Sequence, residues 1–518
     1  MNRTPITKWS WEKRPLPIPA EEIKQTRDAD VVIVGAGLAG MVAALSAREA
    51  GANPILVEKN WTFSARGFHN AAFGSRVQQK MGIEVDYRQV IRDWIRWSQS
   101  KADEVLLWHF ARKSGACMDW LVDIAEAGGM QTGIWDGYYK GPDYTEYPVT
   151  HMFYVPGQPD ISWNYGLSII LDQNLRTSGV EMHYNMPAVR LIREDHGPVT
   201  AVIAGQPGSY TQFNVRRGVI IATGDYASDM EMLERYNSFA LEADAQVYFP
   251  QETNAGEGHK IAMWVGAAMQ KVEPHSTVIH LEAGAMSYFF LHVNSRGKRF
   301  KNEDVNTQSK SCGKLLEPGG IAWTVYDANG LADVQRTIIS SIGGGLFWDQ
   351  TERLMGQEWD MDAEQVLLEE HIKTGKVVTA NTLEELAKKM RVPVDSFLAT
   401  VARYNQMVEQ KDDEDFGKRP ELLTPIVKPP FFAGKLLATI LTASGGLRTN
   451  TECQVLDEDD EPIANLYVAG STAGGFFAND YPTICPGIGH GRCITFGRIA
   501  GIAAAGKNVD DYIPSRRI

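Results

Sequence analysis

The chain has 518 residues, 44% hydrophobic and 22% charged, which is ordinary for a globular protein and long enough for about three domains. Its formal net charge of −13 argues against nucleic acid or an anionic membrane surface as a partner. No apolar run approaches the ~20 residues of a membrane helix, and the N-terminus lacks the apolar core of a signal peptide, so we expect a cytoplasmic location and no membrane partner.

The first 59 residues contain the strongest local signal. Residues 1–27 are predicted to be an extended arm, with a disordered tail as the alternative. A buried strand, Val31–Val34, is followed at once by the GxGxxG motif and then by apolar residues at helical spacing. A second apolar run, Pro54–Val57, ends in an acid. This order predicts a dinucleotide site that uses Gly35, Ala36, Gly37, Leu38, Ala39, Gly40, Glu58 and Lys59.

Each part of this unit has a physical reason. Gly35 allows the tight turn, Gly37 lets a pyrophosphate approach the backbone, and Gly40 lets the helix pack closely on the strand. The helix N-terminus offers free N–H groups to the phosphates. Glu58 can accept hydrogen bonds from the ribose hydroxyls.

The cofactor predicted for this site is FAD. One such unit at the start of a long chain, with no second strand–GxGxxG–helix unit in the sequence, favours a resident FAD over a nicotinamide. The five cysteines form no CxxC pair, so we predict no metal or iron–sulfur site. Electrons are therefore expected from an external donor or acceptor, such as a partner flavoprotein, free reduced flavin or a transiently bound nicotinamide.

Later segments resemble one family. They are RRGVIIATGDY (216–226), TNAGEGHKIAMWVGA (253–267), RGKRFKNED (296–304) and, near the C-terminus, GGLRTNTECQVLDEDDEPIANLYVAGSTAGGFF with TFGRIAG. With the fingerprint, they resemble the fumarate reductase/succinate dehydrogenase flavoprotein family, nearer to its 3-ketosteroid dehydrogenases and gut-bacterial isoflavonoid (equol-forming) reductases than to true fumarate reductases. The resemblance implies further FAD contacts from Ala71, Ala72, Gly74, Ala188, Val189, Thr223, Gly224, Asn254, Gly256, Gly258, Gly470, Ser471, Gly487, Ile488 and Gly489.

The resemblance also implies the architecture. We expect an α/β protein whose Rossmann-like FAD-binding domain is discontinuous, with residues 28–260 as its first part and 420–518 as its second. An α+β capping domain, residues 261–419, is inserted between them. Closure of such a cap over the flavin excludes water from hydride transfer.

The chain departs from fumarate-reducing members at their substrate positions. The family's His-rich triplet is Thr442-Ala443-Ser444 here, and its substrate Arg falls near Ile484. No Arg lies at 327–331, where the proton donor is expected, and Arg336 is the nearest candidate. Since an anionic substrate without positive charge suffers uncompensated desolvation, we predict a larger and mostly uncharged substrate.

Tyr481 is the leading catalytic candidate. It lies in NDYPTICPGIGHGR, which is similar to the Tyr-Pro-Gly-Pro-Gly segment of 3-ketosteroid dehydrogenases but has two extra residues between Tyr and Gly. The resemblance implies that the Tyr481 hydroxyl and a glycine N–H of Gly487 or Gly489 polarise a ketone oxygen. The alternative is a tyrosine packed in a loop.

The proton donor is open among several residues. Glu303 occupies the family's relay position, although the Arg that normally follows it is missing. Tyr288 and His292 lie in the cap, and Arg492 follows the glycine turn, where it either lines the site or has a structural role. His69 is similar to the histidine that binds flavin covalently in succinate dehydrogenases, but it is shifted by one position, so noncovalent FAD is predicted.

The sequence thus predicts hydride transfer between flavin N5 and a carbon next to a carbonyl of a neutral polycyclic small molecule, a steroid enone or an isoflavonoid, in the reducing direction. Three alternatives remain: a desaturating 3-ketosteroid-type dehydrogenase, a non-redox flavin isomerase or hydratase, and an electron-transfer module without a substrate. The oligomeric state is not predicted.

Overall fold

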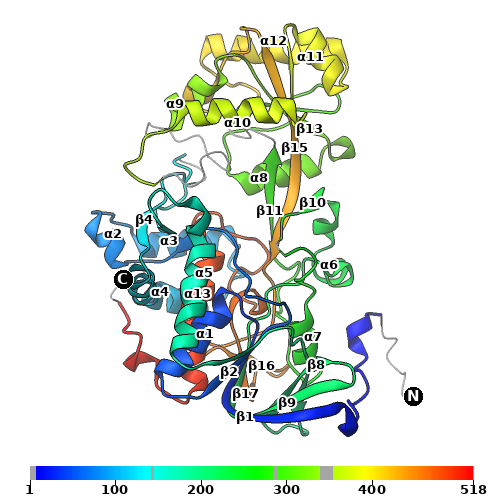
Figure 1. The fold of residues 1–518 in the computed structure, drawn as a ribbon. Helices are drawn as coiled ribbons and strands as arrows, with labels where there is room; N and C mark the ends of the chain where they lie inside the picture. The colour runs from blue at the N-terminus through cyan, green and yellow to red at the C-terminus, as the bar shows by residue number, and fades with distance from the viewer. Residues whose placement is uncertain (1–7, 142–144, 249, 284–288, 339–353, 517–518) are drawn as a thin grey trace.

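The computed structural model describes residues 8–141, 145–248, 250–283, 289–338 and 354–516. These residues form two lobes, and the long strand β15 (Phe431–Ala443) runs from the upper lobe down to the lower one (Figure 1). The larger sheet and the first and last described residues, 8 and 516, belong to the lower lobe. The predicted α/β class is confirmed.

The larger sheet has the order β16-β17-β9-β1-β2-β6, with β7 and β8 attached to β9. Strand β1 is parallel to both neighbours, and Val31–Val34 pairs in register with Pro54–Val57. Both of these runs are buried, as expected for apolar strands covered on both faces. The strands are β1 (Ile23–Val34), β2 (Pro54–Val57), β6 (Glu181–His183), β7 (Ala188–Arg193), β8 (Val199–Gln206), β9 (Ser209–Ile221), β16 (Gln454–Leu456) and β17 (Pro462–Val468).

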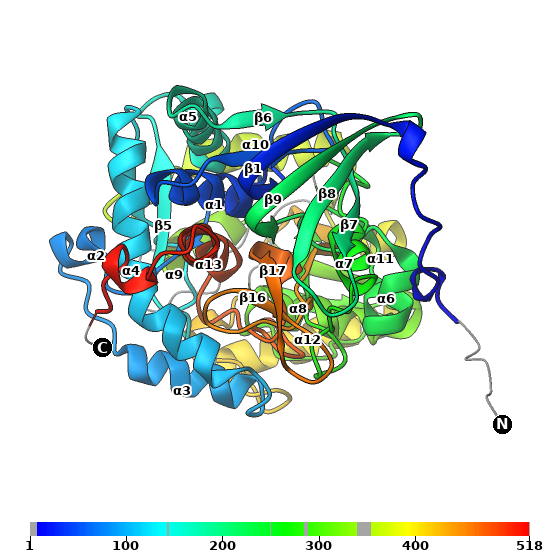
Figure 2. The same ribbon diagram turned by 90° about the horizontal axis from the view of Figure 1, so that it is seen from below.

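Two helices from opposite ends of the chain pack together beside this sheet, α1 (Leu38–Glu49) and α13 (Ile488–Ala504) (Figure 2). Their close approach depends on glycine: a Cβ on Gly501 would lie 2.3 Å from the carbonyl oxygen of Ala43. The other helices and strands of this lobe are α2 (Arg76–Lys80), α3 (Tyr87–Trp97), α4 (Glu104–Ala127), α5 (Trp163–Thr177), α6 (Met230–Tyr236), α7 (Glu257–Met263), β3 (Asn70–Ala71), β4 (Gln131–Ile134) and β5 (Thr150–Tyr154).

The second sheet is built around β15. The order is β10-β15-β13-β12, and β11 and β14 also pair with β15. Its strands are β10 (Ala245–Gln246), β11 (Thr277–Ala283), β12 (Leu291–Asn294), β13 (Ala322–Tyr326) and β14 (Val377–Ala380). The domain boundary expected at residue 420 stays a prediction, and β15, which follows it, continues the sheet of the upper lobe.

Five helices accompany this second sheet: α8 (Thr307–Leu315), α9 (Gly330–Ile338), α10 (Met361–Lys373), α11 (Leu383–Met390) and α12 (Val394–Gln410). The Thr382 side chain accepts the N–H of Glu385 at 3.2 Å and caps α11. Across the described parts of the chain, no helix has the length and apolar character needed to cross a membrane.

The described part of the N-terminal arm packs against the lower lobe. Trp11 is buried, and its carbonyl oxygen accepts a hydrogen bond from the Trp264 indole at 2.8 Å. Arg190 donates to the carbonyls of Pro15 and Leu16 at 2.7 and 2.6 Å. From residue 8 onward the arm is therefore held by specific contacts.

Candidate active site

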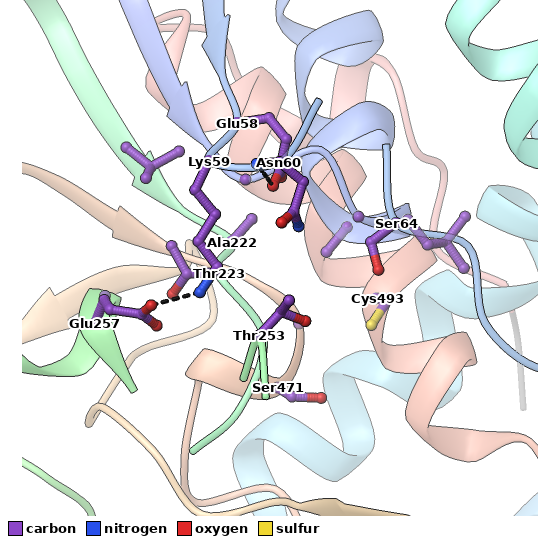
Figure 3. A pocket seen from close by; sticks show the side chains of 18 of the residues that line it. Glu58, Lys59, Asn60, Ser64, Ala222, Thr223, Thr253, Glu257, Ser471 and Cys493 are labelled. Atoms are coloured by element: carbon purple, nitrogen blue, oxygen red, sulfur yellow. Dashed lines mark hydrogen bonds and ion pairs between the residues drawn. The ribbon is translucent and has the colours of Figure 1, made fainter. Parts of the chain in front are cut away.

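A deep pocket opens where β1, β2 and β9 end and α1 begins (Figure 3). About 1130 Å³ of space inside it is free of protein atoms, part of which is open to solvent. The pocket draws residues from both ends of the chain, from Val34 to Cys493.

The start of α1 fits a pyrophosphate group. Gly37 is the N-cap residue, and no side chain caps the helix. A Cβ built on Gly37 meets no protein atom within 4 Å, so this point of the backbone faces open space. A Cβ on Gly40, by contrast, would lie 1.9 Å from the Gly35 carbonyl oxygen. Gly37 therefore leaves room for a ligand, whereas Gly40 serves internal packing.

Glu58 is fixed at the pocket wall by the backbone. Its carboxylate accepts the N–H groups of Ala36 at 2.7 Å and Asn60 at 2.8 Å. Burial raises its pKa, although these hydrogen bonds oppose the shift. The acid therefore stands at the end of β2 in the position suited to ribose hydroxyls.

An ion pair between Lys59 and Glu257 lies next to Glu58 at the edge of the pocket. Figure 3 shows Lys59 reaching from the end of β2 to Glu257 at the start of α7. Both side chains remain partly exposed, at 29% and 43%. The pair therefore lies where the pocket meets solvent.

Three further side chains line the pocket, Arg66, Tyr248 and His490. His490 lies in the first turn of α13, and its Nδ1 lies 2.8 Å from the His69 carbonyl oxygen. Because a carbonyl oxygen only accepts, Nδ1 carries the proton, and Nε2 is left as an acceptor. Burial lowers the pKa of His490 to about 4, so the ring is neutral at pH 7.

Twelve of the residues predicted to bind the cofactor line this pocket. They are Gly35, Gly37, Leu38, Ala39, Glu58, Lys59, Ala188, Thr223, Gly224, Gly258, Gly470 and Ser471.

Other predicted cofactor residues serve the packing around the pocket. Ala36 anchors Glu58, and the Asn254 amide donates to Asp225 at 2.5 Å. Ala71 and Ala72 donate their N–H groups to the carbonyls of Gly487 and Val149 at 3.1 and 3.0 Å. The remainder do not line the pocket: Gly40, Gly74, Val189, Gly256, Gly487, Ile488 and Gly489.

Tyr481 and Gly489 are in direct contact at the start of α13. The Tyr481 hydroxyl oxygen accepts the N–H of Gly489 at 3.0 Å. Tyr481 is only 8% exposed and packs on Phe477, with ring centroids 4.7 Å apart. Burial raises the pKa of Tyr481 above its usual range, so the phenol keeps its proton.

Arg492 lies beneath this turn and is 1% exposed. Its Nη1 donates to the Ala473 carbonyl at 3.2 Å, and its guanidinium lies 4.5 Å from the Phe477 ring centroid. Nε and Nη2 are buried without a hydrogen-bond partner in the described part of the chain. Arg492 does not line the pocket described above.

Glu303 lies inside a buried charge cluster. Arg299 donates to both of its carboxylate oxygens at 2.9 and 2.8 Å, and Lys418 Nζ lies 3.3 Å away. Burial opposes ionisation, but the charges of Lys418 and Arg299 hold its pKa at about 2. A carboxylate bound in this way is a poor proton carrier near pH 7, so its relay role remains a prediction that this geometry does not favour.

His292 is the other proton-donor candidate that the structure describes. His292 is fully buried on β12, and its backbone N–H donates to Glu303 at 3.1 Å. Burial lowers its pKa, and both ring nitrogens lack hydrogen-bond partners among the described residues. Tyr288 lies outside the described residues.

Several pocket residues have no signal in the sequence. Ser64, Arg66, Asn164, Ser168, Tyr248 and Cys493 line the pocket but belong to no motif with a stated chemical role. Ser64 and Arg66 have one cue, because both lie in the segment SARGFHNAAFG with His69, which is similar to a flavin-linked histidine.

Comparison with known proteins identifies the family of the chain. A family model described as an FAD binding domain matches residues 30–482, most of the chain. The vinyl phenol reductase of Lactiplantibacillus plantarum is 26% identical over 500 residues, covering 92% of this chain and 96% of that protein. A probable fumarate reductase of Shewanella frigidimarina is 27% identical over 504 residues, covering 93% of this chain and 75% of that protein.

Two solved structures share the fold. A 3-ketosteroid-delta4-(5alpha)-dehydrogenase from Rhodococcus jostii superposes with a TM-score of 0.71 at 23% identity, covering 94% of this chain and 99% of that one. The open conformation of a flavocytochrome c3 fumarate reductase gives 0.68 at 24% identity, covering 98% and 84%. The predicted resemblance to these flavoproteins is confirmed.

Proposed function

The chain belongs to the FAD binding domain family, and from this premise we propose that it reduces an activated carbon–carbon double bond in a neutral, aromatic or polycyclic substrate. It is an FAD-dependent oxidoreductase of the group of reductases and dehydrogenases that act on C=C or CH–CH groups. Reductases among its relatives support the reducing direction.

The contact between Tyr481 and Gly489 carries the proposal. Since the Tyr481 oxygen already accepts the Gly489 N–H, the phenolic proton is available to a substrate carbonyl. The N–H at the positive end of α13 also polarises this O–H bond. A ketone oxygen held there gains a donor aimed at the charge that develops during reduction.

The surroundings of Tyr481 support an uncharged ground-state substrate. The position of the family's substrate arginine is taken by Ile484, which is 4% exposed, and that of a family histidine by Thr442. Neither of these two positions supplies a charged or imidazole group to replace the hydration that a bound carboxylate would lose. Steroid enones and isoflavonoid ketones fit this description, and the likeness to a vinyl phenol reductase adds phenolic alkenes.

The pocket residues fit FAD. Gly37 and the uncapped start of α1 receive the pyrophosphate, and Glu58 the ribose. When bound, FAD supplies the hydride through its N5. We propose noncovalent binding, because His69 is 8% exposed and packs against the Trp135 ring at 4.3 Å.

We further propose that an external electron donor re-reduces the flavin after each turnover. We also propose that the protein acts in the cytoplasm. A direct test is product analysis under anaerobic turnover with reduced flavin as donor. A steroid enone, an isoflavone-derived ketone and a vinyl phenol are supplied in turn. A product two hydrogens heavier supports the proposal; substrate recovered in desaturated or isomerised form overturns it.

A further inference from the structure

Arg66 is a cation in the pocket wall with an unusual set of contacts. Its Nη2 donates to the Leu441 carbonyl at 2.6 Å, and its guanidinium lies 3.5 Å from the ring centroid of Tyr248. Asn164 donates to the backbone carbonyl of Arg66 at 2.9 Å and so fixes the loop that carries it. The Leu441 carbonyl and the Tyr248 ring therefore hold the Arg66 side chain, and Asn164 holds the Arg66 backbone.

Its place in the pocket is the flavin end. Glu58 marks the ribose end and Gly37 the pyrophosphate, so the pocket continues toward α13, where His490 and Arg66 line it. Leu441 belongs to β15, the strand that links the two lobes. Arg66 thus spans the junction between the pocket and the cap sheet, where the proposed substrate meets the cofactor.

The charge of Arg66 is not neutralised by an ion pair. Of the carboxylates described, none lies within the 4.0 Å that defines such a pair with Arg66. Asp225 is the carboxylate that interacts electrostatically with Arg66. It already accepts hydrogen bonds from Asn254 at 2.5 Å, from the Ala227 N–H at 2.9 Å and from Thr442. Burial raises the pKa of Asp225, while the charge of Arg66 and these hydrogen bonds oppose the shift.

We propose that Arg66 stabilises the negative charge that develops at the flavin end of the pocket during reduction. The inference rests on the proposed function. In that reaction a hydride forms the new C–H bond at the β-carbon, and the C=C electron pair moves to the carbonyl oxygen. A proton then bonds to the α-carbon, while the bound cofactor is oxidised by two electrons. The negative charge belongs either to the substrate oxygen or to the reduced cofactor, and both are anions that a guanidinium stabilises.

The test compares Arg66→Leu with Arg66→Lys. Arg176→Leu is the matched control, since it removes an exposed arginine from α5 whose side chain is 58% exposed. For each purified holoenzyme, FAD content, the two-electron midpoint potential and kcat and KM for the best substrate are measured. The potential is measured without substrate, so it reports on Arg66 even if the proposed substrate class is wrong.

Two results support the proposal and identify the source of the charge. A midpoint potential lowered by about 30 mV or more in Arg66→Leu, equal to a tenfold effect on a two-electron couple, assigns the charge to the reduced cofactor. An unchanged potential with kcat lowered at least tenfold assigns it to the substrate oxygen. In both cases Arg66→Lys keeps most of the wild-type midpoint potential and kcat.

Two results overturn it. One is a potential and kcat in Arg66→Leu that match those of Arg176→Leu. The other is an Arg66→Lys variant whose potential and kcat are lowered as much as those of Arg66→Leu. That result would show that Arg66 acts through its structural contacts with Leu441 and Tyr248. If Arg66→Leu does not retain FAD, Arg66→Lys alone decides: retained potential and kcat support the proposal, and their loss overturns it.

Discussion

The hydroxyl oxygen of Tyr481 accepts the backbone N–H of Gly489 at 3.0 Å, at the first turn of α13. The tyrosine side chain thereby reaches the start of α13, whose next residue, His490, lines the pocket proposed to hold FAD. The Tyr481 phenol is buried and its oxygen already accepts one hydrogen bond, so its proton is available for a hydrogen bond to a substrate carbonyl. This relationship links the glycine turn near the C-terminus to the proposed chemistry.

Removing the Tyr481 hydroxyl tests its role. We expect Tyr481→Phe to lower kcat by about 100-fold or more, the usual loss when one donor to a developing oxyanion is removed. FAD content should stay at the wild-type level, because Tyr481 does not line the pocket. Anaerobic steady-state kinetics with the best substrate measure the effect.

Tyr184→Phe is the control for this variant, since Tyr184 donates to Asp172 at 2.9 Å on the lower lobe. It should turn over like the wild type. Equal rates in Tyr481→Phe and Tyr184→Phe would leave Tyr481 as a packed loop residue.

Two glycines of one motif should respond differently to alanine. Gly37→Ala should fold normally without cofactor, because its Cβ meets no protein atom, but bind FAD at least about tenfold more weakly, or about 1.4 kcal/mol. Gly40→Ala should destabilise the protein itself by about 1–3 kcal/mol, since its Cβ collides with the Gly35 carbonyl. Flavin titration and thermal unfolding of the apoprotein separate the two effects; an unchanged FAD affinity in Gly37→Ala would count against the assigned pyrophosphate site.

The Glu303 cluster predicts a pH-dependent stability. Its folded pKa of about 2 lies below the usual 4.5, so the ionised carboxylate stabilises the fold above pH 4.5, and this stabilisation is lost as pH falls toward 2. Glu303→Gln should lower the free energy of unfolding at pH 7 by about 3 kcal/mol or more, because Lys418 and Arg299 lose a buried partner.

Denaturant unfolding at a series of pH values measures this, and the variant should show a flatter acid profile than the wild type. Full stability of Glu303→Gln combined with a large loss of kcat would instead favour the relay role considered from the sequence.

Much of the lower lobe could be predicted because its signals are local. The run Val31–Val34, the glycine motif and Glu58 follow one another in the chain, and β1, α1 and β2 form from them in that order. The path of β15 could not be anticipated, because its partners β11, β13 and β14 come from three distant segments whose pairing no local pattern encodes.

The same distinction holds for the site. Gly37, Glu58 and Gly470 are marked by motifs and line the pocket. Arg66 and Tyr248 are brought together only by folding, 182 positions apart in the sequence, and neither belongs to a motif. Glu303 matched a family position, but its partner Lys418 lies far along the chain, so its ion pairs were not foreseeable.

The mode of flavin attachment gives a simple test. Precipitation of the holoenzyme with acid should release the flavin into the supernatant, because the proposed binding is noncovalent. Absorbance of the supernatant and the pellet measures the distribution. Flavin that stays with the polypeptide would show a covalent bond, and a His69→Ala variant would then test the histidine considered from the sequence.

The redox state of the bound flavin shows most directly whether the enzyme reduces a neutral substrate. The enzyme is reduced anaerobically with dithionite, and the absorbance of the oxidised flavin band is followed as a steroid enone, an isoflavone-derived ketone or fumarate is added. We predict rapid reoxidation by at least one neutral compound and none by fumarate. Reoxidation by fumarate alone would contradict the account, because it would require an anion site where Ile484 and Thr442 replace the family's charged residues.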